Sequence, residues 1–363
     1  MLFATPPMTA RRAGRLEDLD RLRERLSEGV STFSPWLGTL RREAKAVSVE
    51  SSISIEGFDV SHDEAVAAVE GGEAASTEED RMAASCYARA MDHVGAMATD
   101  PAFAWLDRVI LDLHFDACYF QPDKGPGHWR SGPIAVTGTG APGAIAYRGP
   151  DGEDVPGLMA EVVEWLEAGD LGAHPVVRAA MAHLHVVSVH PFRDGNGRVA
   201  RIVQSLVLAR EQLVSAEFGS IEEYLARHTP AYYAALGTVQ GGSYEPQRDA
   251  SPWVDFCIDA HLAQARQRIE QMDAAAGRWS ALEELADRSG WPDRLVIAME
   301  QSLMGGSSRM AYGREAGVSP ATASADFRRL RDAGLVDLHG QGPSTRYAAS
   351  ERLRRLVDAQ AAG

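Results

Sequence analysis

Hydrophobic and polar residues alternate with a helical period along most of this 363-residue chain. Apolar residues recur three and four positions apart, which is typical of helices that bury one face. Two longer apolar runs, 176–189 and 202–209, predict helices that are buried on most sides, the second of which continues to 212. One further predicted helix begins near Leu37. The others span 16–26, 78–97, 102–119, 157–168, 220–227, 229–236 and 253–276. The chain is therefore predicted to be mainly α-helical.

Two short stretches have the alternation of strands instead. Residues 134–137 and 144–147 flank the glycine-rich segment 138–143, which predicts a β-hairpin. Near the C-terminus, residues 333–338 and 345–347 flank a second glycine-containing loop and predict another hairpin. In the helix predicted over 102–119, we expect Phe103, Trp105, Leu106, Val109, Ile110 and Leu113 to lie in the core.

The composition narrows the class of protein. The 36 Lys and Arg residues against 51 Asp and Glu residues give a net charge of -15, which disfavours non-specific binding to nucleic acid or anionic membranes. The three cysteines are scattered and match neither a disulfide framework nor a zinc site. We find no signal-peptide core and no apolar run long enough to cross a membrane. The expectation is a cytoplasmic protein with no membrane partner.

The polar segment between the two long apolar runs concentrates groups that bind phosphate. Residues 190–201 read His-Pro-Phe-Arg-Asp-Gly-Asn-Gly-Arg-Val-Ala-Arg, which predicts a tight loop followed by a helix. The amides of such a loop, at a helix N-terminus, form an anion site. Asp194 offers a hard oxygen ligand for magnesium, and His190 can accept a proton near neutral pH. This combination indicates nucleotidyl or phosphoryl transfer.

The segment resembles the signature of the Fic family, HPFx[DE]GNGRxxR, at every defining position. The resemblance implies transfer of AMP from ATP to a protein hydroxyl. It also implies that His190 is the general base and that Asp194 holds Mg²⁺. The implied phosphate-binding residues are Gly195, Asn196 and Gly197, which line the anion hole, and Arg198 and Arg201, which bind the outer phosphates.

Residues 47–57 allow two readings. The alternation of Val, Ser and Ile predicts an edge strand with a solvated glutamate, whereas Gly57 suits the end of a helix. The run Ser52-Ile-Ser-Ile-Glu56-Gly57 matches the [ST]xxxE[GN] inhibitory motif of Fic proteins, which lies at a helix end. The resemblance therefore favours the helix. It implies that Glu56 pairs with Arg201 and leaves ATP misplaced.

The resemblance also assigns a role to the first hairpin. In Fic proteins a hairpin in this place, the flap, adds a target segment as an extra strand. Its docking candidates here are Ile134, Val136 and Ile145, and a solvent hairpin without a partner is the alternative. Tyr232 and Tyr233 are candidates for contact with adenine, with ordinary core packing as the alternative. His183 and His185 face different sides of a helix, so we interpret them as core histidines rather than zinc ligands.

The C-terminal region resembles a winged helix-turn-helix. Gly317 separates two predicted helices, and Ser319 caps the second. Between residues 309 and 355, nine arginines stand against five acids, an excess of four positive charges that suits phosphate contacts. The candidate DNA contacts are Thr322, Ser324, Arg328 and Arg329. Such modules also serve as platforms for protein interaction or dimerisation, so both uses remain open.

The domains predicted from these patterns are an N-terminal helical region with the inhibitory motif (1–95), a Fic core with its flap at 130–148 (96–280) and a winged helix (288–355). The leading function is a Mg-ATP-dependent protein adenylyltransferase that Glu56 inhibits. Its target would be a Ser, Thr or Tyr hydroxyl of an unidentified protein. The alternatives are removal of AMP, transfer of phosphate or phosphocholine, and a DNA-binding regulator with a nucleotide-sensing core. A homodimer is an additional expectation from the resemblance.

Overall fold

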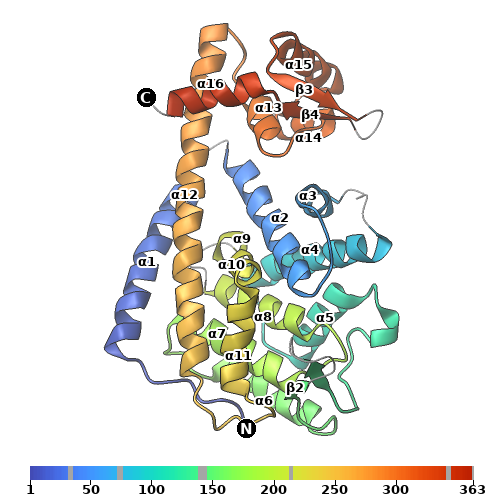
Figure 1. Cartoon of the computed structure of the whole chain (residues 1–363), viewed down its shortest axis with the longest axis vertical. Coiled ribbons are helices and arrows are strands. Elements are labelled where there is room, and N and C mark those ends of the chain that lie inside the picture. The colour runs from blue at the N-terminus through green and yellow to red at the C-terminus, as the bar shows by residue number, and fades with distance from the viewer. Residues whose placement is uncertain (32–35, 72–76, 138–144, 212–215, 341–344, 362–363) are drawn as a thin grey trace. The chain divides into compact units, whose positions relative to one another are not determined.

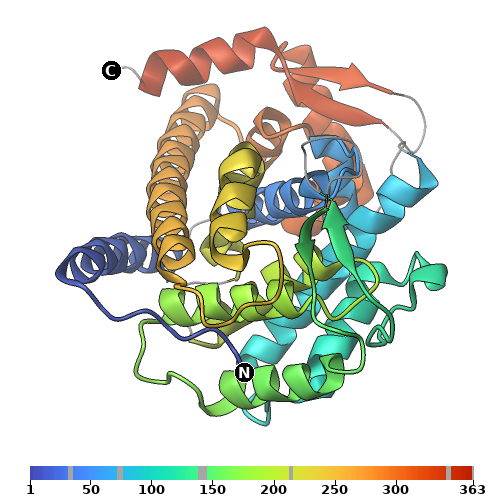
Figure 2. The ribbon, with the colours of Figure 1, turned by 60° about the horizontal axis from the view of Figure 1, so that its bottom comes forward.

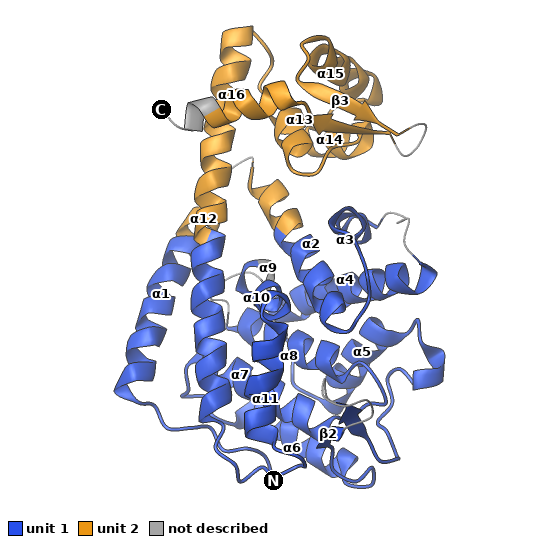
Figure 3. Ribbon diagram, viewed as in Figure 1, with its two compact units in different colours: residues 1–27, 44–268 blue, residues 28–43, 269–363 orange. Residues whose placement is uncertain are grey.

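The computed structural model describes residues 1–31, 36–71, 77–137, 145–211, 216–340 and 345–361, which are mainly helical (Figure 1). The chain divides into two units: residues 1–27 with 44–268, and residues 28–43 with 269–363 (Figure 3). No helix within the described ranges combines the length and the apolar composition needed to cross a membrane. The domain boundaries expected from the sequence stay predictions.

The elements of the first unit follow one another in this order: α1 (Ala10–Ser31), α2 (Leu37–Ile55), α3 (His62–Val69), α4 (Glu78–Thr99), α5 (Asp107–Cys118), the short 3-10 helix η1 (Pro122–Lys124), β1 (Ala135–Thr137), β2 (Ile145–Arg148), α6 (Val155–Ala168), α7 (Pro175–Val189), α8 (Asn196–Arg210), α9 (Ala216–Gly219), α10 (Glu222–Arg227), α11 (Thr229–Gln240) and α12 (Ser251–Ser289). The ends of α1 and α12 and the start of α2 belong to the second unit. That unit continues with α13 (Arg294–Leu303), α14 (Arg309–Glu315), α15 (Pro320–Asp332), β3 (Val336–His339), β4 (Arg346–Ala349) and α16 (Glu351–Ala361).

The core of the first unit is built on α7 and α8, the two helices predicted from the long apolar runs. Every residue of α7 from Val176 to Val189 is buried, as expected for a helix that is apolar on most of its surface. Helices α4 and α5 pack on α8, and α6 packs on α7. Trp253 of α12 is fully buried, and its indole nitrogen donates a hydrogen bond to the Ala180 carbonyl at 2.7 Å. The loop between α7 and α8 is therefore supported from several sides.

Residues 47–55 are the end of helix α2, so the helical reading of this segment is correct and the strand reading is wrong. Val49 and Ile53 lie four positions apart and are both fully buried, which is a helical pattern of burial. The chain leaves the helix at Gly57, whose φ of 90° lies in the left-handed region that favours glycine. Local alternation of Val, Ser and Ile was misleading because tertiary packing selects which residues are buried.

The helix predicted over 102–119 begins later, at Asp107. Residues 101–106 form a turn and an extended stretch, in which the ring of Phe103 packs edge-on against Trp105 at 5.2 Å. Leu106 is 58% exposed, so its assignment to the core is wrong, whereas Ile110 and Leu113 are fully buried as expected. The start of the helix was misplaced because these aromatic residues pack on each other ahead of α5.

The predicted flap forms a hairpin of β1 and β2, seen as the pair of green arrows in Figure 2. The strands are antiparallel, with Val136 opposite Tyr147. The Tyr147 hydroxyl donates to the Ser188 carbonyl of α7 at 2.5 Å, which ties β2 to the end of the core helix. The Arg148 amide donates to the Gly242 carbonyl at 3.0 Å, so β2 is held on its other edge as well. The glycine-rich tip, residues 138–143, lies outside the described residues.

The second unit contains two helices and a hairpin in the order expected for a winged helix-turn-helix. A turn at Gly317, with φ of 63°, separates α14 from α15, and the Ser319 hydroxyl caps α15 by accepting from the Thr322 amide. Strands β3 and β4 pair antiparallel, and Tyr347 of β4 stacks on Phe327 of α15 with ring centres 4.0 Å apart. The assignment of this unit as a winged helix-turn-helix remains a prediction.

The interior of this unit includes a buried carboxylate that ties its helices together. Asp326 of α15 is 3% exposed and accepts two hydrogen bonds from the Arg294 guanidinium of α13, at 2.8 and 3.1 Å. It also accepts from the Tyr312 hydroxyl of α14 at 2.8 Å. A bidentate Arg–carboxylate pair of this kind fixes orientation as well as distance.

Candidate active site

The loop between α7 and α8 begins at His190, which ends α7 in the left-handed conformation with φ of 52°. A non-glycine residue in this region costs on the order of 1 kcal/mol, and such strain is typical of functional sites. The His190 amide still donates to the Val186 carbonyl at 3.0 Å, and Pro191 prevents the helix from continuing. The backbone therefore turns sharply at the proposed general base.

The hydrogen bonding of His190 defines its tautomer. Its Nδ1 lies 3.0 Å from the Val187 carbonyl, which can only accept, so Nδ1 carries the proton and Nε2 is the basic nitrogen. Burial lowers the pKa of His190, and the charge of Arg130 adds to this, while Glu56 and Asp194 act in the opposite direction. A neutral imidazole with a basic Nε2 is the state that can accept a proton at neutral pH.

The glycines and Asn196 shape the start of α8. Gly195 has φ of 76°, and the Asn196 side chain closes the loop because its Oδ1 accepts from the Phe192 amide and its Nδ2 donates to the Phe192 carbonyl. Asn196 can therefore serve an anion only through its backbone amide. The Val199 amide bonds the Gly195 carbonyl at 3.0 Å, so the amides of residues 196–198 precede the first i→i−4 bond of α8. These amides suit an anion.

Asp194 lies in the same loop and is 38% exposed. Its Oδ1 accepts from the Gly195 amide at 2.7 Å and is 3.8 Å from Arg198 Nη2. The described part of the chain has no group of three or more His, Cys, Asp and Glu side chains suited to a metal. Magnesium commonly binds through one or two carboxylates together with substrate phosphates, so a single exposed aspartate fits that ion.

Arg198 and Arg201 lie on α8 with their side chains buried, at 1% and 2% exposure. Arg198 Nη1 donates to the Ala117 carbonyl at 3.2 Å, and the guanidinium lies 5.6 Å from the rings of Phe58 and Phe120. Among the described residues, Arg198 Nε and Arg201 Nη1 are buried without a hydrogen-bond partner. Buried donors of this kind are costly, and phosphate oxygens are the acceptors that arginine binds best.

The motif at the end of α2 reaches Arg201. Arg201 Nη2 pairs with Glu56 Oε1 at 2.8 Å and with the Ser52 carbonyl at 2.9 Å, and Nε donates to the Ser52 hydroxyl at 2.8 Å. Burial alone would raise the pKa of Glu56, but Arg201 and Arg198 outweigh it and lower that pKa. Glycine at 197 permits the approach, because a Cβ there would lie 2.6 Å from Glu56 Oε1. The expected Glu56–Arg201 pair is present, and it includes Ser52.

Two residues that the sequence reasoning did not assign to the site support its loop. His114 of α5 stacks on Phe192 with ring centres 3.6 Å apart, and its Nδ1 accepts from the Gly127 amide at 2.9 Å. Its Nε2 therefore carries the proton and donates to the Asp194 carbonyl at 3.1 Å. Burial lowers the pKa of His114 to about 4, which keeps the ring neutral. His114 lies 80 residues before Asp194, and no pattern in the sequence predicts that a single histidine at that distance supports the loop.

Arg130 is the second such residue. Its guanidinium donates to the carbonyls of His190, Gly132 and Pro150 at 2.7, 2.6 and 2.7 Å, and more weakly to Val189 at 3.3 Å. The side chain is 3% exposed, and burial lowers its pKa. Arg130 thus joins the base of the flap to the start of the loop. In the sequence, Arg130 is only the first residue of the predicted flap, 130–148, with no role of its own.

The other candidates occupy different places. Tyr232 is 1% exposed, and its hydroxyl lies 3.1 Å from His183 Nε2, which agrees with the core-packing alternative. Tyr233 is 45% exposed, and its hydroxyl donates to the Ile55 carbonyl at 3.4 Å, next to Glu56. His185 is buried against Trp165. Core packing explains Tyr232 and both histidines because their side chains are enclosed.

The flap candidates differ in exposure. Ile145 of β2 is 44% exposed, whereas Ile134, just before β1, and Val136 are half-buried. On α15, Arg328 and Arg329 are exposed, while the Thr322 hydroxyl lies 2.9 Å from the Ser319 hydroxyl and the Ser324 hydroxyl donates to the Pro320 carbonyl at 2.8 Å. The two arginines are thus more available to a ligand than the two hydroxyls, since both hydroxyls already bond groups at the start of α15.

Residues 105–208, which include the loop and both arginines, match the model of the Fic/DOC family. A protein adenylyltransferase Fic from Aedes aegypti is 30% identical over 260 residues, 68% of this chain and 46% of that protein. The chain belongs to the Fic family. Protein adenylyltransferase fic-1 from Caenorhabditis briggsae is 33% identical over 121 residues, which cover 33% of this chain and 21% of that protein. The match to these curated relatives covers less than half of their length.

The fold is also similar to that of solved Fic proteins. A Fic family protein from Desulfovibrio desulfuricans superposes with a TM-score of 0.62 at 20% identity, over 96% of this chain and 98% of that one. Residues 134–508 of Fic-1 from C. elegans superpose with a TM-score of 0.55 at 22% identity, over 73% of this chain and 76% of that one. The predicted fold class, a Fic-type helical fold with a small β-hairpin, is confirmed.

Proposed function

We propose that this Fic protein transfers AMP from ATP to a hydroxyl of a protein target. The observation that carries the proposal is the arrangement of groups between the end of α7 and the start of α8. The basic Nε2 of His190 lies in the same segment as the amides of residues 196–198. Two buried arginines, Arg198 and Arg201, follow on α8, and each has a side-chain donor without a partner. The names of the relatives from Aedes aegypti and Caenorhabditis briggsae support the same activity.

In the proposed reaction, the target hydroxyl oxygen bonds to the α-phosphorus of ATP, and the bond from that phosphorus to the β-phosphate oxygen breaks. His190 Nε2 takes the hydroxyl proton, and pyrophosphate leaves. The amides at the start of α8 stabilise the phosphate charge, and Arg198 and Arg201 orient the outer phosphates. Exposed Ile145 would contact the target segment on the flap.

Asp194 would hold Mg²⁺ together with the phosphates of ATP. When bound, that ion neutralises charge on the phosphates during transfer. The Asp194 carbonyl is held by His114 and its Oδ1 by the Gly195 amide, so the protein presents this carboxylate in a defined orientation. The residues present would therefore suit one magnesium ion bound together with the nucleotide.

Glu56 would act as an inhibitor in this proposal. Its carboxylate occupies Arg201 Nη2, a donor that the outer phosphate of ATP would need. ATP would then bind with its phosphates displaced from the in-line geometry that transfer requires. Removal of the carboxylate should therefore increase the rate of transfer rather than abolish it.

The test is incorporation of label from α-labelled ATP with magnesium into the protein itself. We expect strong labelling for Glu56→Gly, weak labelling for the wild type, and none for Glu56→Gly combined with His190→Ala. Labelling from γ-labelled ATP instead would show phosphate transfer. Absence of labelling in every variant, with nucleotide binding retained, would refute AMP transfer from ATP, and release of AMP from a modified target would indicate removal.

A second function is favoured by the surface of α15. Arg328 and Arg329 are exposed on the second helix of the helix-turn-helix, where such modules contact DNA phosphates. We therefore propose DNA binding as an additional activity. A promoter-fragment mobility shift that is lost in the Arg328→Ala, Arg329→Ala double variant, and kept in His190→Ala, would support it. Equal shifts in all variants would refute a role of α15.

A further inference from the structure

Helix α2 presents a polar stripe that extends beyond the inhibitory motif. Ser48, Ser52 and Glu56 follow one another at intervals of four residues, so the two serines lie on one face of α2 and Glu56 comes next, directly after the helix ends at Ile55. Ser48 is 2% exposed and Ser52 is fully buried. Ser52 and Glu56 both bind Arg201, whereas Ser48, two turns before Glu56, binds a different group.

That group is Glu222, the first residue of α10 and itself 2% exposed. The Ser48 hydroxyl donates to Glu222 Oε2 at 2.5 Å, and the Tyr87 hydroxyl of α4 donates to Oε1 at 2.5 Å. Ser48 Oγ also lies 2.9 Å from Ser220 Oγ. Because the single Ser48 proton goes to Glu222, Ser220 is the donor in that second bond. Both oxygens of the buried carboxylate are therefore satisfied.

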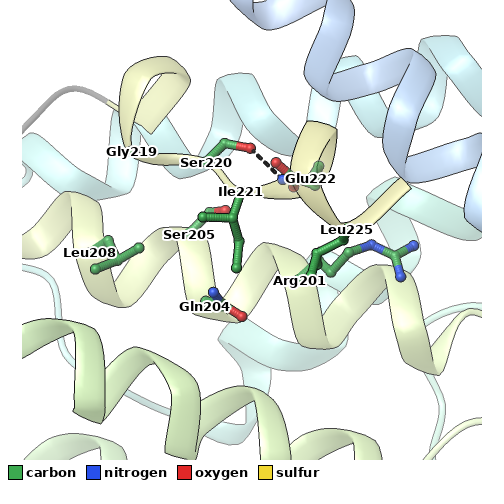
Figure 4. A pocket seen from close by; sticks show the side chains of 9 residues that line it. All are labelled: Arg201, Gln204, Ser205, Leu208, Gly219, Ser220, Ile221, Glu222 and Leu225. Carbon is green, nitrogen blue, oxygen red and sulfur yellow. Dashed lines mark hydrogen bonds between the residues drawn. The ribbon is translucent and has the colours of Figure 1, made fainter. Parts of the chain in front are cut away.

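Glu222 and Arg201 line the same small cavity. Figure 4 shows Arg201, Gln204 and Ser205 along α8 and Ser220 and Glu222 on the segment above it. Burial raises the pKa of Glu222, while the bonds from Ser48 and Tyr87 and the charge of Arg201 act in the opposite direction. The stripe on α2 is thus bound at both ends by groups that surround one cavity.

We propose that Ser48 and Glu222 form a second anchor for the inhibitory helix and that this anchor positions Glu56 on Arg201. The inference rests on the proposed function, because it concerns how firmly inhibition is maintained. The Ser48 hydroxyl bonds Glu222 and Ser220 rather than Arg201 or the loop of residues 190–197, so it acts as a positioning residue. Its effect reaches Glu56 through the last part of α2, from Ser48 to Ile55, which is about 10 Å long, and then through the turn that follows the helix.

The anchor should set the fraction of molecules in which Glu56 is withdrawn. A buried hydrogen bond to a charged acceptor changes an equilibrium constant by about tenfold or more when it is lost completely. Val49 and Ile53 keep α2 packed in the core, so loss of the anchor loosens the helix without releasing it. We therefore expect Ser48→Ala to increase self-labelling by about three- to tenfold over the wild type, and by less than Glu56→Gly.

The experiment measures initial rates of self-labelling from α-labelled ATP with magnesium for the full chain. The matched control is Ser51→Ala, which removes the same group from the same helix at a position that is 8% exposed and off the polar stripe. We expect Ser51→Ala to match the wild type. We also expect the Ser48→Ala change to have no further effect in the Glu56→Gly background, because the anchor acts only through Glu56.

Two results would overturn the proposal: a wild-type rate for Ser48→Ala while Glu56→Gly is activated, or an equal change in both backgrounds. Hydrogen exchange gives a readout that does not depend on activity. The amides of Glu56 and Gly57 bond the carbonyls of Ile53 and Ser54 at 3.0 Å, and they should exchange faster in Ser48→Ala but not in Ser51→Ala. If Glu56→Gly shows no labelling, the proposed function fails, and unchanged exchange in Ser48→Ala would separately refute the anchor.

Discussion

Removal of the Glu56 carboxylate should make the protein less stable as well as more active. Arg201 is 2% exposed and keeps only its bonds to Ser52 when Glu56 is replaced by alanine. A hydrogen bond to a charged group contributes about 1.5–3 kcal/mol. Glu56 is 19% exposed, so water can partly replace its carboxylate beside Arg201. We therefore expect Glu56→Ala to lower the free energy of unfolding by about 2 kcal/mol. For a domain of about 250 residues this lowers Tm by about 4–8 °C.

Nucleotide should reverse this loss, because a phosphate can replace the missing carboxylate beside Arg201. Saturation at about one hundred times Kd adds about 2.7 kcal/mol to stability. Calorimetry of the wild type and Glu56→Ala, each with and without MgATP, should show a larger ATP-induced rise in Tm for the variant. Glu153→Ala, at an exposed position, is the control. An unchanged Tm for Glu56→Ala, or equal rises with MgATP, would refute the assigned role of the ion pair.

Three further outcomes are expected. Since the pKa of His190 lies below its ordinary value of 6.5, the rate of transfer in an uninhibited variant should fall only when the pH drops below that value; an acid limb above it would contradict the assigned base. Arg130→Lys should lower kcat by about tenfold to a hundredfold with little change in Kd for MgATP, because lysine cannot bridge the carbonyls of His190 and Pro150. An unchanged kcat would argue against a role of Arg130 in holding the loop. Asp326→Ala should lower the free energy of unfolding of the second unit by about 2–4 kcal/mol, measured by urea titration, because it leaves Arg294 and Tyr312 without their buried partner; a change below about 0.5 kcal/mol would refute it.

The sequence was most informative where function depends on neighbouring residues. The loop of residues 190–201 could be recognised because a candidate base, a candidate metal ligand and a candidate anion site lie within one short segment, and their spacing follows from a turn and a helix start. The long apolar runs around it predicted α7 and α8 for the same local reason. Periodicity failed at residues 47–57 and at Leu106, where local spacing was compatible with more than one pattern of burial.

The helical class, the loop and the two hairpins were thus determined by local pattern, since hydrogen bonding and side-chain periodicity within a segment depend on nearby residues. Contacts between distant segments were decided only by tertiary packing. Glu56 meets Arg201 across 145 positions, Ser48 meets Glu222 across 174, and Arg130 reaches the His190 carbonyl across 60. Such pairs depend on which helix faces the core contacts, and local periodicity does not specify that. The candidate groups of the loop could therefore be read from the sequence, and Glu56 from its resemblance to a family motif, whereas Ser48, Glu222 and His114 became visible as neighbours of the site only in the fold.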